Sequence, residues 1–146
     1  MSGLEGVWRI VQAHDVDAEG QTTNSFPQTS VVIFTPGHYS FVWTFGSETR
    51  QPASEHWRSS DAEKIAAYNS IIVNTGTYEV TGSTMVTRPI SAKSQEYVAG
   101  GYSDYDYRVE GDTLYLTGTS LVSFDGSTID FFSDGGRDNF TLVRVE

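Results

Sequence analysis

Apolar and polar residues alternate in short runs along most of this chain, and Gly, Asn and Asp separate the runs. Successive side chains of a β-strand point to opposite faces, so alternation over about four to eight residues is typical of strands with one buried face. Alternating or continuously apolar runs cover residues 6–13, 29–36, 38–46, 75–81, 84–91, 102–110, 112–119 and 139–145, with shorter candidates at 120–124 and 128–133. The pattern predicts about eight to ten strands.

Several connections between these runs are short and carry turn residues. They are Pro36-Gly37, Thr81-Gly82-Ser83, Glu110-Gly111-Asp112 and Asp125-Gly126-Ser127. Each contains a residue that tolerates a positive φ angle, which tight hairpins require. Consecutive hairpins indicate an antiparallel meander.

One segment departs from the strand pattern. Ser59 and Ser60 can cap a helix, and Asp61 and Glu63 place acidic side chains in its first turn, where they favour the helix dipole. The residues that follow, Lys64-Ile65-Ala66-Ala67-Tyr68, suit a helix interior. We therefore predict one short helix of about ten residues between the third and fourth strands.

Many antiparallel strands with one helix form either a sandwich or a barrel, and closure into a barrel removes exposed sheet edges. We favour an all-β, antiparallel, up-and-down barrel, because every second residue of 38–45 is aromatic on one face. The expected interior comprises Tyr39, Phe41, Trp43, Phe45, Trp8, Ile10, Tyr78, Val80, Tyr105, Tyr107, Val109, Leu114 and Leu116. A solid core would more economically use Leu, Ile and Val, so this aromatic face favours a hollow barrel.

Composition fits one globular domain over residues 1–146, with 38% hydrophobic and 13% aromatic residues. The net charge of −10 would repel phosphate backbones and anionic membrane surfaces, so we expect neither nucleic acid nor membrane partners. The acidic residues are scattered, which is typical of a solvated surface, and a cationic ligand is the alternative interpretation. No cysteine is present, which excludes disulfides, thiolate metal sites and a Cys nucleophile.

The first residues lack a basic region followed by an apolar stretch, and no run approaches the roughly 18 apolar residues of a membrane span. We therefore expect a cytoplasmic protein, as a monomer or homodimer. His14, His38 and His56 have no metal-ligand spacing, and motifs for hydrolase nucleophiles, phosphates and dinucleotides do not occur. The sequence thus predicts no metal and no cofactor.

The opening Gly6-Val7-Trp8 is a Gly-x-Trp motif at the start of the first strand, and it resembles the signature of the lipocalins and the wider calycin superfamily. In that family the Trp closes one barrel end beneath an Arg of the last strand. The resemblance therefore implies that Trp8 and Arg144 form a barrel-closing structural pair. The alternative is that Arg144 is only a surface charge.

The resemblance extends to the bacterial stand-alone lipocalin-like domains. Four blocks carry it in matching order: Leu4-Glu5-Gly6-Val7-Trp8-Arg9-Ile10-Val11, Phe34-Thr35-Pro36-Gly37-His38-Tyr39, Asn74-Thr75-Gly76-Thr77-Tyr78-Glu79-Val80 and Val109-Glu110-Gly111-Asp112-Thr113-Leu114-Tyr115-Leu116. Each block is weak alone, and together they span nearly the whole chain. This family implies an internal cavity for small apolar molecules.

Two polar features are candidates for the ligand site. On strand 84–91, Thr84, Val86, Arg88 and Ile90 share a face, and if that face points inward Arg88 enters the cavity as a polar anchor. If it points outward, Arg88 is solvated. His56 and Trp57, ahead of the helix, would form a lid over the barrel mouth, unless Trp57 only packs beneath the helix.

Our leading hypothesis is a non-catalytic carrier or sensor for a small apolar or aromatic molecule. Its ligand-binding residues would be Tyr39, Phe41, Trp43, Tyr78, Arg88, Tyr105, Tyr107, His56 and Trp57. The alternative is a cofactor-free cyclase or isomerase of a polyketide-like or terpenoid molecule, with a His or Glu base and tyrosine hydroxyls that stabilise a developing oxyanion. The polar residues on its shortlist are His38, His56, Glu79 and Arg88. A third hypothesis is an interaction module without a ligand.

Overall fold

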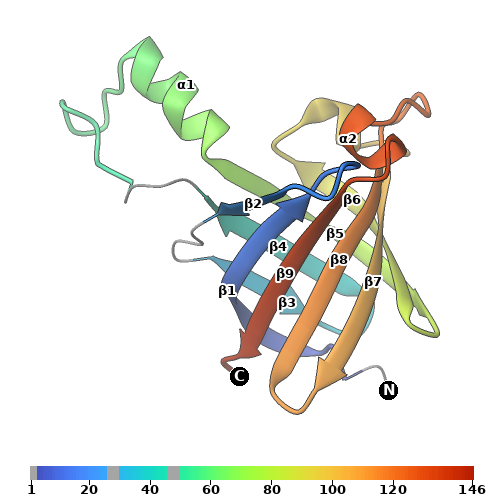
Figure 1. Cartoon of the computed structure of the whole chain (residues 1–146). Helices are drawn as coiled ribbons and strands as arrows, with labels where there is room; N and C mark the ends of the chain where they lie inside the picture. Colours follow the sequence, from blue (N-terminus) through green and yellow to red (C-terminus); the bar gives the residue numbers. More distant parts are fainter. Residues whose placement is uncertain (1–2, 26–29, 46–49) are drawn as a thin grey trace.

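Nine strands form one antiparallel sheet that closes on itself (Figure 1). The computed structural model describes residues 3–25, 30–45 and 50–146. The strands are β1 (Gly6–Val16), β2 (Thr22–Ser25), β3 (Val31–Phe34), β4 (His38–Thr44), β5 (Ile71–Thr81), β6 (Thr84–Ala92), β7 (Tyr102–Glu110), β8 (Thr113–Val122) and β9 (Arg137–Arg144). Two α-helices, α1 (Asp61–Asn69) and α2 (Asp130–Ser133), and a 3-10 turn, η1 (Gln95–Tyr97), interrupt them.

The long first strand closes the barrel. From Trp8 to Val16, β1 pairs with β9, while its other edge pairs with β3 near the start and with β2 near the end. Eight strands therefore make the closed barrel, and β2 is an additional short strand. This confirms the predicted all-β antiparallel barrel. The ends of two predicted strands, residues 29 and 46, lie outside the described residues.

The predicted aromatic face of β4 points into the barrel. Tyr39, Phe41 and Trp43 are buried, and Phe45 packs against the same core. Trp8, Ile10, Leu114, Leu116 and the other residues expected inside also belong to this cluster. The alternation within each strand was sufficient to predict these faces, because side-chain direction follows from local backbone geometry.

The predicted helix is present as α1, between β4 and β5. Ser60 is its N-cap: the Ser60 hydroxyl accepts a hydrogen bond from the Glu63 backbone N–H at 3.2 Å, and the Glu63 carboxylate accepts one from the Ser60 N–H at 2.9 Å. This reciprocal capping box starts the helix from local sequence alone. None of the nine helical residues is buried, and α1 projects away from the barrel (Figure 1).

The strand candidate at 128–133 was wrong. Thr128 makes a single bridge to Val122, and Asp130–Ser133 then turn into the short helix α2. The candidate at 120–124 is largely the end of β8. The connection between the neighbouring strands β8 and β9 is therefore a long loop that contains α2 rather than a tight hairpin.

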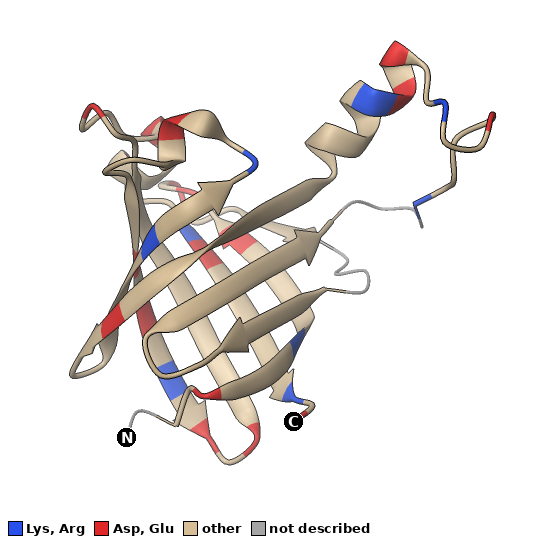
Figure 2. Ribbon diagram, turned by 180° about the vertical axis from the view of Figure 1, so that it is seen from behind, with Lys and Arg blue, Asp and Glu red and all other residues tan. Residues whose placement is uncertain are grey.

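Acidic side chains occur along the barrel, in its turns and on α1 rather than in one patch (Figure 2). Among the described residues, no helix has the length and apolarity needed to cross a membrane. The start of β1 and the C-terminus lie at the end of the barrel opposite α2 (Figure 1).

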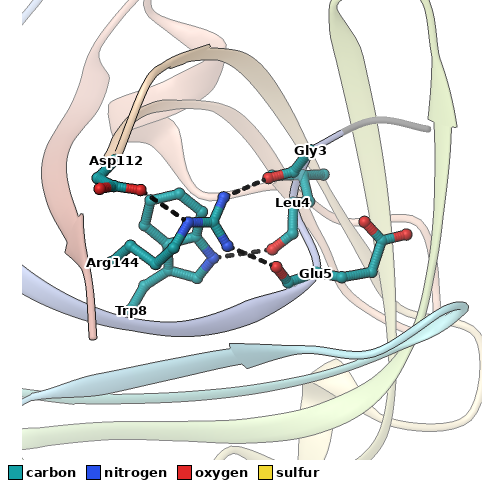
Figure 3. Close-up of polar contacts among 6 residues, drawn as sticks. All are labelled: Gly3, Leu4, Glu5, Trp8, Asp112 and Arg144. Atoms are coloured by element: carbon teal, nitrogen blue, oxygen red, sulfur yellow. Dashed lines mark hydrogen bonds and ion pairs between the residues drawn. The ribbon is translucent and has the colours of Figure 1, made fainter. Parts of the chain in front are cut away.

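Trp8 and Arg144 organise the barrel end near the termini (Figure 3). The Trp8 ring is completely buried, and its indole N–H donates to the Leu4 carbonyl at 2.8 Å. The Arg144 guanidinium lies 4.2 Å from the ring centre. It also donates to the Glu5 carbonyl at 2.7 Å and the Gly3 carbonyl at 2.9 Å, and pairs with Asp112 at 3.3 Å. One side chain thus ties the N-terminal segment to the last strand and to the β7–β8 turn.

Arg144→Lys should lower the free energy of unfolding by about 1–2 kcal/mol, because an ammonium cannot reproduce the planar set of contacts to two carbonyls and a carboxylate. Urea unfolding measures this loss. Arg108→Lys is the matched control, since Arg108 also lies over a ring, that of Tyr115 at 4.4 Å, but on an exposed surface. Equal losses in the two variants would show that the Arg144 contacts add nothing specific.

Candidate functional site

A cavity of about 350 Å³ lies in the barrel at the end opposite Trp8. Its walls come from the end of β4, the start of β5, the start of β7, the end of β8 and the start of β9, with α2 and the segment around η1 at the rim. The lining residues are Phe41, Trp43, Phe45, Asn69, Ile72, Val73, Asn74, Ala92, Lys93, Ser94, Tyr97, Ser103, Tyr105, Gly118, Ser120, Leu121, Ile129, Phe132, Asp138 and Phe140. This volume is at the small end of the roughly 300–1,000 Å³ range of ligand pockets.

Packed aromatic rings make one wall of the cavity rigid. The Trp43 ring meets Phe140 edge to face at 4.9 Å and lies 4.9 Å from Phe45. Phe41 contacts Phe140 from the other side at 5.7 Å between ring centres. Because each ring is held by its neighbours, the wall offers a preformed apolar surface to a ligand.

The cavity exists partly because two neighbouring strands separate. β6 and β7 pair only over Thr84–Thr87 and Ser103–Asp106. Beyond this point Tyr97, from η1, fills the gap: its hydroxyl lies 3.3 Å from Thr87 Oγ1 and also hydrogen-bonds the Ser103 hydroxyl. A tyrosine side chain, rather than a strand, therefore seals this part of the wall.

Three tyrosine hydroxyls lie near this polar side of the cavity. Tyr39 donates to the Asn74 amide oxygen at 2.5 Å, and burial raises the pKa of Tyr39 above its usual range. Burial likewise raises the pKa values of Tyr97 and, further, of Tyr105. These hydroxyls stay protonated near neutral pH and can donate or accept hydrogen bonds.

The Trp43 indole N–H has no hydrogen-bond partner among the described residues. Its side chain is only 6% exposed and lines the cavity. A buried donor without an acceptor is costly, and such groups usually have a ligand or ordered water as partner. An ordered water or an acceptor atom of a ligand in the cavity would satisfy this N–H.

Two carboxyl groups meet across β1 and β9, and one of them lies at the cavity. Asp15 of β1 and Asp138 of β9 are directly opposite in the register, and Asp138 lines the cavity. Burial, as the largest cause, and then the hydrogen bond and charge of Asp15 together raise the pKa of Asp138 to about 8. Two adjacent carboxylates cannot both ionise easily, so the pair keeps a proton near neutral pH.

Lys93 lies at the rim, below α1. Its ammonium group donates to the backbone carbonyls of Tyr68 and Ile71, and lies 4.2 Å from the centre of the Tyr68 ring. Burial lowers the pKa of Lys93. Because these contacts occupy the ammonium group, Lys93 holds the end of α1 next to the cavity. Among the described residues, no group of three or more His, Asp or Glu side chains could hold a metal ion.

The family of the chain follows from its sequence match. The profile of the lipocalin-like domain family matches residues 5–130, which spans β1 to β8. The chain belongs to the lipocalin-like domain family. No curated protein matches it. The last strand, β9, follows the matched region and brings Asp138 and Arg144 to the two ends of the barrel.

Of the predicted ligand-binding residues, Phe41, Trp43 and Tyr105 line the cavity of this lipocalin-like protein. Tyr39 does not line the cavity itself, but its hydroxyl donates a hydrogen bond to Asn74, which does. Tyr78 does not line the cavity, because it packs against Phe34 and donates to the Thr35 carbonyl at 2.8 Å.

Tyr107 also lies away from the cavity, toward the Trp8 end of the barrel, where its hydroxyl donates to the Gly82 carbonyl at 3.1 Å. The expectation that both Tyr78 and Tyr107 point inward holds. Their position along the strands, however, places them below the cavity floor, where the barrel is filled by side chains.

Arg88 lies on the outer face of β6. The prediction that it enters the cavity as a polar anchor is therefore wrong. Met85 and Thr87 are buried, whereas Arg88 is exposed and sits 5.5 Å from the centre of the Tyr102 ring. The sequence of β6 has apolar residues on both faces, so alternation does not decide its orientation. Solvation of the guanidinium is the physical reason for the observed choice, because a buried, unpaired guanidinium is strongly destabilising.

The lid prediction for His56 and Trp57 also differs from the structure. Both side chains are exposed, and Trp57 is completely so. They precede α1, which projects away from the barrel (Figure 1), and neither lines the cavity. Trp57 does not pack beneath the helix either, so that interpretation is wrong, whereas a lid that orders over bound ligand stays a prediction.

Sequence reasoning missed the polar part of the cavity, which is Asn74, Tyr97, Ser103 and Asp138, and also missed Asp15, which pairs with Asp138. One signal was available. Asp138 lies two residues before Phe140, and Asp15 two after Ala13, so alternation places both carboxyls on inward faces. Their meeting depends on the register between β1 and β9, including the shift between Ile10 and Gln12, which the sequence does not reveal.

Proposed function

We propose that this lipocalin-like protein binds a small, mostly apolar or aromatic molecule in the barrel cavity and acts as a carrier or sensor in the cytoplasm. The observation that carries the proposal is the unpartnered indole N–H of Trp43 in the wall of a cavity of about 350 Å³. An apolar frame would contact the packed rings, and one acceptor atom would satisfy the N–H.

Native mass spectrometry of the protein purified from its own host tests this proposal first. A reproducible extra mass, absent after denaturation, supports a bound small molecule and identifies its class. Bare protein that also fails to bind apolar aromatic probes counts against the proposal and favours an interaction module.

Trp43→Phe should weaken binding of 1-naphthalenemethanol by roughly fivefold to tenfold, because about 1 kcal/mol of one neutral hydrogen bond is lost while the ring wall is kept. Binding of 1-methylnaphthalene, which has no oxygen, should change less than twofold by the same reasoning. Isothermal titration calorimetry measures both affinities. Trp57→Phe is the matched control, since Trp57 is fully exposed. Equal weakening of both probes would assign Trp43 a packing role only.

A second candidate function is cofactor-free isomerisation or cyclisation of a polyketide-like or terpenoid molecule, and Asp138 favours it. A carboxyl that keeps its proton near neutral pH can act as a general acid, and the neutral Tyr105 hydroxyl on the same cavity can stabilise a developing oxyanion. The earlier candidates His38, His56, Glu79 and Arg88 are all exposed and none lines the cavity.

Incubation of the copurified molecule with wild type and with Asp138→Asn separates the two functions. Conversion that only the wild type supports indicates the enzyme, and unchanged ligand with both proteins indicates the carrier.

A further inference from the structure

We propose that the ligand of this cavity is an organic cation: a protonated amine on an aromatic frame, with its ammonium group bound by the Asp15 and Asp138 carboxyls. This inference rests on the proposed function, because it names the ligand class of the same cavity. The acidic composition alone favoured a solvated surface over a cationic ligand. The position of these two carboxyls now favours the cationic ligand.

Both carboxyls belong to the inner face of the barrel. Asp138 precedes the buried Phe140 by two residues, and Asp15 follows the buried Ala13 by two. Since side chains at i and i+2 share a face, both point inward, and the pairing of β1 with β9 sets them side by side. The Asp138 carboxyl therefore lines the cavity, and Asp15 lies beside it on the same inner face.

A glycine opens this place to the cavity. Gly118 pairs with Asp138 across β8 and β9 and lines the cavity. A Cβ at Gly118 would lie 3.5 Å from the Asp138 Cβ and 3.7 Å from Cε1 of Tyr105. Any larger side chain would occupy the space beside the carboxyl, so the glycine leaves room for a ligand group there.

No basic side chain of the described residues neutralises the pair. The four ion pairs found in that part of the chain involve Glu55, Asp61, Glu110 and Asp112, and neither Asp15 nor Asp138. Arg137 precedes Asp138 in β9, so its side chain points to the opposite face of the strand. It donates a hydrogen bond to the Gly136 carbonyl at 2.7 Å.

From the neighbouring strands, the titratable groups near the pair are His14 and Tyr105. His14 precedes Asp15 in β1 and lies in an outer-face groove with Arg108 and Tyr115. Tyr105 of β7 is neutral near pH 7, because its pKa is raised by burial and by the nearby Tyr97, Tyr39 and Asp138 groups. The Lys93 ammonium also lines the cavity, but the Tyr68 and Ile71 carbonyls hold it and it forms no ion pair with either carboxyl. The negative charge of the carboxyl pair is thus left for a ligand to neutralise.

The rest of the cavity suits a cation on an aromatic frame. Phe140 lies on the same face as Asp138, and Trp43 packs against it edge to face. Ring faces attract cations more strongly when water is excluded, so the wall and the carboxyls favour the same ligand charge. The net charge of −10 adds a long-range attraction for cations.

Trp43 contributes an independent requirement. Its unpartnered N–H cannot be satisfied by an ammonium group, which has donors only. The ligand therefore carries a hydroxyl, ether or carbonyl oxygen in addition to the amine. A protonated amine on an aromatic frame that also carries one such oxygen meets both requirements.

Calorimetric titrations with three probes of the same ring system test the charge preference. They are 1-naphthylmethylamine, 1-naphthalenemethanol and 1-naphthoate, which are cationic, neutral and anionic at pH 7.5. We expect the amine to bind at least about tenfold more tightly than the alcohol, and the carboxylate to bind weakest. This series uses the wild-type protein and requires no variant to fold.

Asp15→Asn/Asp138→Asn should abolish the preference for the amine and leave the affinity for the alcohol within about twofold. Asp106→Asn removes one charge outside the cavity, where Asp106 is exposed, and should keep the preference. One charge is the matched loss, because the Asp15–Asp138 pair already keeps one proton near neutral pH. This control separates the local carboxyls from the total charge of the protein.

Proton release gives a third readout. If the ammonium replaces the proton that the carboxyl pair holds, amine binding near pH 7 should release up to about one proton, and alcohol binding none. Titrations in buffers of different ionisation enthalpy measure this number.

The outcomes separate the inference from the proposed function. Alcohol binding as tight as amine binding, or an amine preference that survives loss of both carboxyls, overturns the cation inference while a ligand-binding barrel stands. Failure of all three probes to bind, together with bare protein in native mass spectrometry, overturns the proposed function itself.

Discussion

Trp8→Ala should lower the free energy of unfolding by about 3–5 kcal/mol, the range for deleting a large buried aromatic side chain. The Trp8 ring is 0% exposed, its N–H is bonded to Leu4, and the Arg144 guanidinium packs over it. The substitution removes the ring and also leaves the guanidinium above a void. The barrel end would then lose the contacts that join β1 to β9.

Urea unfolding followed by circular dichroism measures this loss. Trp57→Ala deletes the same side chain from a completely exposed position, and should change stability by less than about 0.5 kcal/mol. A loss below about 1 kcal/mol for Trp8→Ala, close to that of the control, would show that the ring does not support the barrel end.

The stability of the wild type should fall relative to Asp138→Asn as pH rises from about 5 to 8. An aspartate in the unfolded chain ionises near its usual pKa of 3.8, whereas the pKa of Asp138 in the folded protein is raised to about 8. Between these values only the folded state holds the proton, so raising the pH favours unfolding. The slope of the difference can reach about 1.4 kcal/mol per pH unit for one proton.

Urea unfolding at pH 5, 6, 7 and 8 measures both proteins. Above about pH 8 the difference should level off, because the folded state has also lost its proton. Asp106→Asn, an exposed substitution on the outer face of β7, should follow the wild type at every pH. Parallel curves for wild type and Asp138→Asn would show that burial does not hold a proton on this carboxyl.

Some of the candidate site could be predicted from one strand at a time. Tyr39, Phe41 and Trp43 alternate with polar or smaller residues, and all three are buried. The same rule gave no unique answer for β6, where Met85 and Val86 are adjacent apolar residues on opposite faces. Solvation of Arg88 decided which face of β6 points inward. That choice depends on the neighbours that surround the strand.

Position along the barrel axis was also beyond the sequence. Tyr78 and Tyr107 face inward as the pattern indicates, yet their hydroxyls bond Thr35 and Gly82 below the cavity. Alternation reports the face of a side chain but not its height in the barrel. Height depends on strand register and bulges, such as the shift between Thr75 and Gly76 in β5.

The sequence by itself determined the strand pattern, the capped helix and the Gly-x-Trp start, because each depends on residues close together in the chain. Only the tertiary structure decided which groups share the cavity. Asp15 and Asp138 come from opposite ends of the sequence and meet through the closure of β1 onto β9. Burial and charge at that meeting point arise from all surrounding strands at once, and local sequence does not encode them.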